Sequence, residues 1–443
     1  MRRNKSSSPA PTSPWRPVWL TNDLIYLLAG RGLRSLAQGY LLIIVPLYLD
    51  LLGYNAEHLG ILFAASAVVS AIMVGAVGIL SDRFGRKTLL IVISLMMAGG
   101  GIVFAVSSNF IALTAGAALG TIGRGGGAGS GGAWGPYYPA EQPLIAEQAA
   151  DHQRTMIFGV LSFVGVLASA FGSLLAYAPE LLHQNSGAPM VRGYRALFIL
   201  TAVLGVAMAL IVIPVRETHR LGKPSQHKIG RQKTHRSILG VSLTHETWGL
   251  IVRFMVTNSV NGLAVGMLGP FVTYWFYRRY GVGAGTIGSL FFILNLIAAV
   301  PYLTAGRVAR RFGVVSSVVI CRAISSVLLI VLAVMPTFAL AGVVYGIRVI
   351  FNTLSLPVRQ SYIMGIIRPE ERASAAGLSN LPSQASSAVS PYFAGYFMQN
   401  IALSLPLEVA AILMGVNTAL YYFFFHKIRP PEELEITEEP GGR

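Results

Sequence analysis

The strongest constraint on this chain is an internal repeat. A ladder of glycines with an Arg-Phe pair occurs twice at a constant interval. The first copy is Gly53, Gly60, Gly78, Arg83, Phe84 and Gly85, and the second is Gly281, Gly288, Gly306, Arg311, Phe312 and Gly313. Each copy begins after one long apolar segment and runs through a second. The chain is therefore a duplication, and the repeated unit is a set of membrane helices.

The composition fits a chain whose outer surface faces lipid. Hydrophobic residues make up 53% of the 443 residues and charged residues only 12%, and a soluble protein of this size could not bury so much apolar surface. The single cysteine, Cys321, excludes a disulfide framework and a thiolate metal cluster. No nucleophile with a neighbouring base stands out. We therefore expect no enzyme, no metal site and no cofactor.

Apolar segments of about 20 residues, the length that crosses a bilayer core, predict an all-α membrane protein of two pseudo-symmetric six-helix bundles. The predicted spans of the first half are residues 24–50, 57–80, 88–107, 110–134, 156–178 and 196–215. Those of the second half are residues 248–276, 285–306, 314–335, 338–358, 373–398 and 402–425. The predicted organisation is a disordered N-terminal tail (1–22), a bundle (23–215), a basic linker (216–246), a second bundle (247–427) and an acidic tail (428–443).

The distribution of charge predicts the orientation. The net charge is +16, and most Lys and Arg fall in the tails and loops assigned to one side. Positive loops stay cytoplasmic, so we expect an integral protein of the plasma (inner) membrane with both termini in the cytoplasm. No soluble domain presents these cations, which excludes a nucleic-acid partner.

One loop carries a specific signature. Between the second and third spans stand Gly78, Ile79, Leu80, Ser81, Asp82, Arg83, Phe84, Gly85, Arg86 and Lys87. This loop resembles the signature of the major facilitator superfamily, Gly-x-Leu-(Ala/Ser)-Asp-Arg-x-Gly-Arg-(Lys/Arg). With the twelve spans, the basic central linker and the repeat, the resemblance covers essentially the whole chain except its tails.

The resemblance implies a secondary transporter, usually monomeric, in which this loop acts as a gate. The candidate gating residues are Gly78, Asp82, Arg83, Gly85, Arg86 and Lys87. The glycines permit a tight turn, and one anion among three cations fits a cluster that holds the loop against a neighbouring helix. The second copy has Arg310 in place of Asp82 and Val314 in place of Arg86, so only the first copy is expected to form the full clamp.

Ionisable residues inside apolar spans are costly and usually face a polar cavity. In the first span Arg31, Arg34 and Gln38 share one face through steps of three and four, and Arg253 and Asn261 repeat the theme in the seventh. In the family, spans 1, 4, 7 and 10 line the central cavity. The candidate substrate-cavity residues are Arg31, Arg34, Gln38, Arg124, Arg253, Asn261, Asn295, Tyr345, Arg348 and Asn352. Arg31 and Arg253 could instead reach the cytoplasmic interface by snorkelling, and Arg322 in the ninth span is interpreted as structural.

Embedded carboxylates are scarce. Glu141, which follows Pro136 and Pro139, is the nearest candidate for a proton site, the alternative being a solvated loop residue just beyond the fourth span. A cavity with several arginines and few carboxylates favours an anion through charge-assisted, bidentate contacts.

The sequence thus predicts a rocker-switch transporter for a small anionic solute, with protons as a candidate coupling ion. A multidrug/proton efflux antiporter is the alternative, supported by the aromatic cavity candidates Tyr40, Trp275, Tyr302 and Tyr345. A non-transporting membrane receptor on the same fold is the second alternative.

Overall fold

The computed structural model describes residues 20–122, 135–148, 154–216, 237–238, 241–242, 245–366, 372–426 and 428. These residues are almost entirely helical, as expected where backbone groups must be satisfied without water. The helices of the first half are α1 (Asn22–Leu51), α2 (Ala56–Phe84), α3 (Arg86–Val106), α4 (Phe110–Gly120), α5 (Tyr137–Gln148), α6 (Arg154–Leu174), the 3-10 turn η2 (Leu175–Tyr177), α7 (Ala178–Ser186) and α8 (Met190–Val212). Those of the second half are α9 (His245–Leu268), α10 (Phe271–Tyr280), α11 (Ala284–Phe312), α12 (Val314–Val334), α13 (Phe338–Ile366), α14 (Arg372–Asn400) and α15 (Leu405–Phe425). A short antiparallel pair, β1 (Ser237–Ile238) and β2 (Val241–Ser242), lies in the linker.

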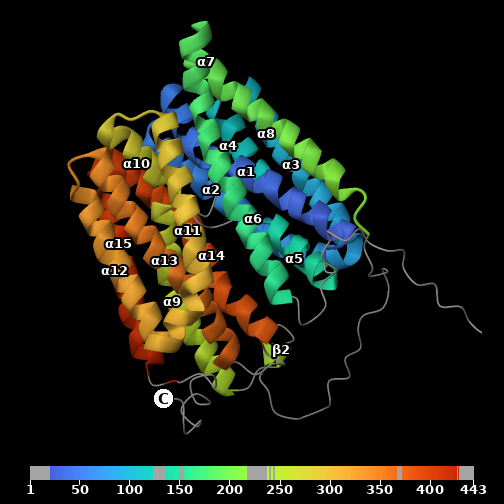
Figure 1. Ribbon diagram of the computed structural model, residues 1–443, viewed down its shortest axis with the longest axis vertical. Helices are drawn as coiled ribbons and strands as arrows, with labels where there is room; N and C mark the ends of the chain where they lie inside the picture. Colours follow the sequence, from blue (N-terminus) through green and yellow to red (C-terminus); the bar gives the residue numbers. More distant parts are fainter. Residues whose placement is uncertain are drawn as a thin grey trace, which may run out of the picture.

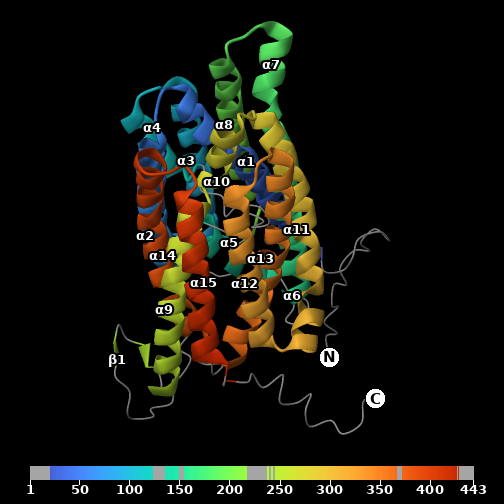
Figure 2. The same ribbon diagram turned by 90° about the vertical axis from the view of Figure 1, so that its left-hand side faces the viewer.

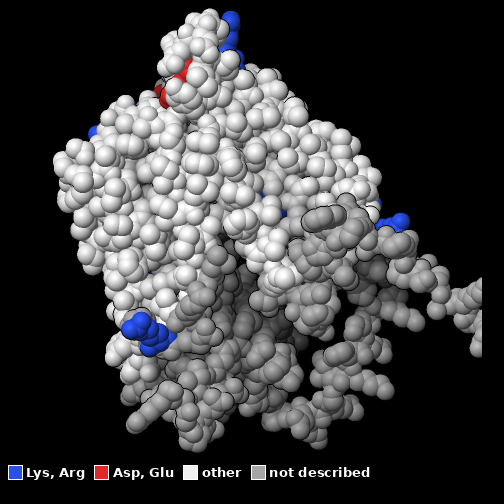
Figure 3. Space-filling view, in the orientation of Figure 1, with Lys and Arg blue, Asp and Glu red and all other residues white. Residues whose placement is uncertain are grey.

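The two halves form two bundles that lie side by side, the second half on the left and the first on the right in Figure 1. Figure 2 shows α7 projecting beyond the bundles at one end. The outer faces expose apolar side chains such as Ile72, Ile111 and Phe423, each more than half exposed. The middle of the described surface in Figure 3 carries almost no charge. This is the surface of an integral membrane protein.

Ten helical segments in the described part of the chain are long and apolar enough to cross a membrane. The predicted spans 110–134 and 373–398 are not among these ten segments. α14 is rich in serine, but it packs between α9 and α2 and so needs less apolar surface. The fourth span was expected to run unbroken over residues 110–134, and this is wrong: α4 ends at Gly120 with Thr121 in the left-handed region (φ 52°), and α5 begins only at Tyr137.

Backbone conformation and close helix packing explain why these glycines occur in both halves. Gly85 between α2 and α3 has φ 88°, and Gly313 between α11 and α12 has φ 80°, a conformation that only glycine adopts without strain. Gly60 on α2 packs against the backbone of Pro391 on α14, and its repeat mate Gly288 on α11 packs against the backbone of Ser173 on α6. The duplicated glycines therefore mark the two lines along which one half meets the other.

Candidate functional site

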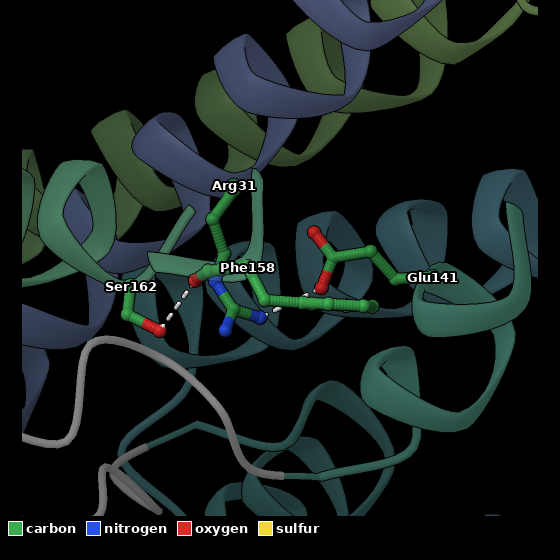
Figure 4. A network of polar contacts seen from close by, with 4 residues as sticks. All are labelled: Arg31, Glu141, Phe158 and Ser162. Carbon is green, nitrogen blue, oxygen red and sulfur yellow. Dashed lines mark hydrogen bonds and ion pairs between the residues drawn. The ribbon is translucent and has the colours of Figure 1, made fainter. Parts of the chain in front are cut away.

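The first half contains a buried ion pair. Arg31 of α1 donates from Nη1 to Oε2 of Glu141 on α5 at 2.7 Å, and the two side chains are 1% and 0% exposed. Figure 4 shows the pair beside Phe158 of α6, whose backbone carbonyl accepts a hydrogen bond from Ser162. Of the two alternatives for Glu141, the solvated loop residue is wrong, because Glu141 lies on helix α5 and its side chain is 0% exposed. Arg31 likewise does not snorkel to the interface.

The other residues on this face of α1 contact the same region. The guanidinium of Arg34 lies 4.9 Å from the centroid of the Tyr137 ring, and that of Arg31 lies 5.8 Å from the Tyr138 ring. Nε2 of Gln38 donates to the carbonyl of Thr121 at 3.4 Å. The predicted face of α1 thus packs against the end of α4 and against α5, where a cation–π contact offsets part of the cost of burying Arg34. The role of Tyr137 and Tyr138 was missed, because no apolar periodicity marks α5.

The candidate residues of the seventh span differ in burial and in hydrogen-bond partners from their counterparts in the first span. Arg253 on α9 is exposed, while Oδ1 of Asn261 accepts a hydrogen bond from Nη2 of Arg322 on α12 at 2.8 Å. Nη1 of Arg322 also donates to Oδ1 of Asn417 on α15, and Asn417 in turn donates to the carbonyl of Thr257. Asn261 therefore belongs to a polar network that ties α9, α12 and α15 together inside the second half.

The remaining candidates lie on α11 and α13. Arg348 is 5% exposed; its guanidinium lies 5.5 Å from the Tyr345 ring centroid, and its Nη2 donates to Sδ of Met414 on α15 at 3.7 Å. Asn352 is half-buried. Asn295 is buried, and its Nδ2 donates to the carbonyl of Phe291 one turn earlier at 2.8 Å.

The structure gathers the candidates into two groups, each with its contacts inside one bundle. Arg31, Arg34, Gln38 and Glu141 form the first, and Asn261, Tyr345 and Arg348 belong to the second. Arg124 lies outside the described residues, as do the side chains of Asp82 and Arg83 in the gating loop. Gly78 falls within α2, Gly85 makes the turn, and Arg86 and Lys87 are half-buried at the start of α3.

Polar contacts join the halves at the end from which α7 projects. Oδ1 of Asp50 on α1 accepts from the hydroxyl of Tyr274 on α10 at 3.1 Å and lies 3.6 Å from Nη1 of Arg278. Oε1 of Glu180 on α7 accepts from the backbone N–H of Gly285 on α11 at 3.0 Å.

The sequence profile of the Major Facilitator Superfamily matches residues 27–259 and 254–443. The chain belongs to this superfamily. Its fold and family are those of transporters. An uncharacterized membrane protein of Saccharomyces cerevisiae is similar, with 22% identity over 90% of this chain and 96% of its own length. The multidrug resistance protein MdtG of Salmonella paratyphi A shares 27% identity over 72% of this chain and 75% of its own length.

Solved structures show the same fold. The inward-open xylose transporter XylE of E. coli aligns with a TM-score of 0.67 at 16% identity, covering 94% of this chain and 99% of that one.

Proposed function

We propose that this protein is a monomeric secondary active transporter that moves a small anionic solute by rocker-switch alternating access. The observation that carries the proposal is the charge buried among the helices. Four guanidinium groups, those of Arg31, Arg34, Arg322 and Arg348, are buried in the described part of the chain. Glu141 is the one carboxylate buried there. The described residues therefore bury more positive than negative charge, which is expensive, and an anionic solute would supply negative charge.

The contacts between the halves support a state open on one side. The polar contacts of Asp50 and Glu180 that join the halves lie at the end from which α7 projects. With both termini in the cytoplasm of a plasma (inner) membrane, closure at the α7 end corresponds to an inward-facing state. Opening the other way would separate Gly60 from α14 and Gly288 from α6, and would close the ends near the gating loop between α2 and α3.

The Arg31–Glu141 pair supports proton coupling. While Glu141 is ionised, it holds the guanidinium of Arg31 at 2.7 Å. Protonation of Glu141 would neutralise it and release Arg31 to attract an anion, so a proton and an anion would move together. In this scheme Glu141 is the proton site.

The alternative is a multidrug/proton efflux antiporter. Its support is the similarity to MdtG, together with the same buried carboxylate. Two of the aromatic cavity candidates do not support the antiporter, because each makes a hydrogen bond within its own bundle. Tyr40 is hydrogen-bonded to Thr201 at 2.7 Å, and Trp275 donates to Ser404 at 2.9 Å. A non-transporting receptor remains the second alternative.

The test is transport in proteoliposomes loaded with a panel of solutes. Phosphate, sulfate and small carboxylates are compared with neutral sugars and a cationic dye, each with and without a pH gradient. We expect uptake of at least one anion, lost in Arg34→Ala. Glu141→Gln is expected to remove the dependence on the pH gradient. Transport of neutral or cationic solutes alone, unaffected by Arg34→Ala, would refute anion transport.

A further inference from the structure

Two hydrogen bonds between the halves satisfy backbone groups that their own helices leave without a partner. In one, Thr273 of α10 donates to Leu42 of α1. In the other, Gly285 of α11 donates to Glu180 of α7. We call these two bonds the reciprocal contacts, because each half completes a helix of the other.

The first reciprocal contact compensates for a proline. Pro46 lies inside α1 and has no backbone N–H, so the carbonyl of Leu42, four residues earlier, lacks its ordinary helical donor. The hydroxyl of Thr273 donates to this carbonyl at 3.0 Å, and Thr273 is buried. The same hydroxyl lies 3.5 Å from the carbonyl of Pro270 in its own half, at the limit of a hydrogen bond. The second half thus supplies a donor that the first-half helix cannot.

The second reciprocal contact concerns a helix N-terminus, and the repeat shows what is missing there. The equivalent helices are α2 and α11, and α2 carries its own cap. The side chain of Asn55 accepts from the backbone N–H of His58 at 3.1 Å, and Glu57 places a negative charge in the first turn. Both features stabilise the N-terminus of a helix. The start of α2 is therefore satisfied within the first half.

The start of α11 lacks both features. Gly283 stands in place of Asn55, and the N-cap makes no side-chain hydrogen bond. Gly285 stands in place of Glu57, and the first turn holds no acidic residue. The carboxylate of Glu180 accepts from the backbone N–H of Gly285 at 3.0 Å instead. A side chain at either glycine would collide with this carboxylate, so the two glycines make room for a cap that comes from the first half.

We infer that the reciprocal contacts form a lock that exists only while the α7 end is closed, and that this lock sets how often the transporter opens there. The inference rests on the rocker-switch motion of the proposed function and is independent of the charge of the solute. When the halves separate at this end, the Leu42 carbonyl and the first turn of α11 must exchange their protein partners for water. Each exchange costs the net free energy of one hydrogen bond. Thr273 and Glu180 are thus positioning residues, which act without touching the solute.

The experiment measures how often the α7 end opens, through the labelling rate of a buried thiol. Ser173 is buried where the backbone of α6 meets Gly288 of α11, so Ser173→Cys, in a chain with Cys321→Ser, reacts only after the halves separate. The purified full-length protein is labelled in lipid nanodiscs with a membrane-impermeant maleimide and without solute. When reclosing is faster than labelling, the rate is proportional to the open fraction. Ser186→Cys, at an exposed position of α7, reports the intrinsic reactivity of the reagent and should not respond to the variants.

Two variants each remove one reciprocal contact. Thr273→Val removes the hydroxyl with little change of shape, and Glu180→Ala removes the cap of α11. Each should speed labelling about three- to tenfold, the equivalent of one hydrogen bond or one cap. The matched controls are Tyr280→Phe, which removes a hydroxyl-to-carbonyl bond of 2.8 Å to Met335 inside the second half, and Glu408→Ala, which removes an exposed carboxylate from the first turn of α15. Both controls should label at the wild-type rate, and an unchanged rate in Thr273→Val or in Glu180→Ala would overturn the lock.

A further variant separates the lock from simple stabilisation of α11. Gly283 has φ −75° and ψ 175°, the extended backbone of an ordinary N-cap, so Gly283→Asn in the Glu180→Ala background gives α11 a cap of the kind that Asn55 gives α2. This double variant should regain the thermal stability lost in Glu180→Ala and still label fast. If its labelling returns to the wild-type rate, Glu180 only stabilises α11 and the lock is wrong.

Uptake of anions into proteoliposomes separates this inference from the proposed function. If the wild type transports no anion but labelling follows the expected pattern of variants, the lock stands and anion transport is wrong. If the wild type transports an anion while Thr273→Val and Glu180→Ala label at the wild-type rate, anion transport stands and the lock is wrong.

Discussion

The buried pair of Arg31 and Glu141 allows a quantitative test. Its charged atoms lie 2.7 Å apart and both side chains are essentially inaccessible. Removing one partner of such a pair leaves an uncompensated buried charge, so Glu141→Gln should cost about 3–5 kcal/mol of unfolding free energy. Arg31→Met should cost less, because a stranded carboxyl group can take up a proton and become neutral.

The double variant is the informative one. Arg31 Nε and Glu141 Oε1 are buried without a hydrogen-bond partner, so the pair is incompletely satisfied and replacing both residues should restore much of the stability. The double-mutant cycle should then give a coupling of about 2–4 kcal/mol.

The assay is reversible unfolding of the purified protein in mixed detergent micelles, followed by tryptophan fluorescence. The matched control is the same cycle on Asp50 and Arg278, which lie 3.6 Å apart with Arg278 54% exposed. Screening by solvent should limit that coupling to under about 1 kcal/mol. Equal couplings in the two cycles, or additive losses for Arg31 and Glu141, would show that the buried pair does not stabilise the fold as argued.

Three further predictions concern alternating access. Gly60→Ala places a methyl carbon 2.8 Å from the carbonyl oxygen of Pro391, so spin labels on α2 and α14 should report a wider separation at the α7 end, while Gly75→Ala, which meets nothing within 4 Å, should not change it. Asp50→Ala removes the acceptor of Tyr274 and the partner of Arg278 and should shift the same spin-label distance toward opening; an unchanged distance distribution would contradict a latch at Asp50. Asp82→Asn should leave membrane insertion intact and lower the transport turnover number, and unchanged uptake rates would count against the gating role of the loop.

The superfamily and the fold class could be predicted because they rest on local patterns. Apolar segments of membrane length, the glycine ladder and the motif from Gly78 to Lys87 are each readable without knowing any contact. The shared face of Arg31, Arg34 and Gln38 followed from helix geometry alone, and in the structure all three contact α5 or the end of α4.

The partners of the buried charges could not be predicted in this way. Glu141 comes after a glycine-rich run that hid the start of α5, and Asn417 lies in an otherwise apolar span, so nothing local linked it to Arg322. Arg253 and Arg31 look alike in sequence, yet one is exposed and the other is paired.

By itself the sequence determined a duplicated set of membrane helices with buried arginines, because helix length, helical period and composition act over a few turns of the chain. Only the tertiary structure decided which arginine received a carboxylate and which were left to converge on α15. That choice depends on how helices distant in the chain rotate and pack against one another, and in a low-dielectric interior a few ångströms decide whether a charge is compensated.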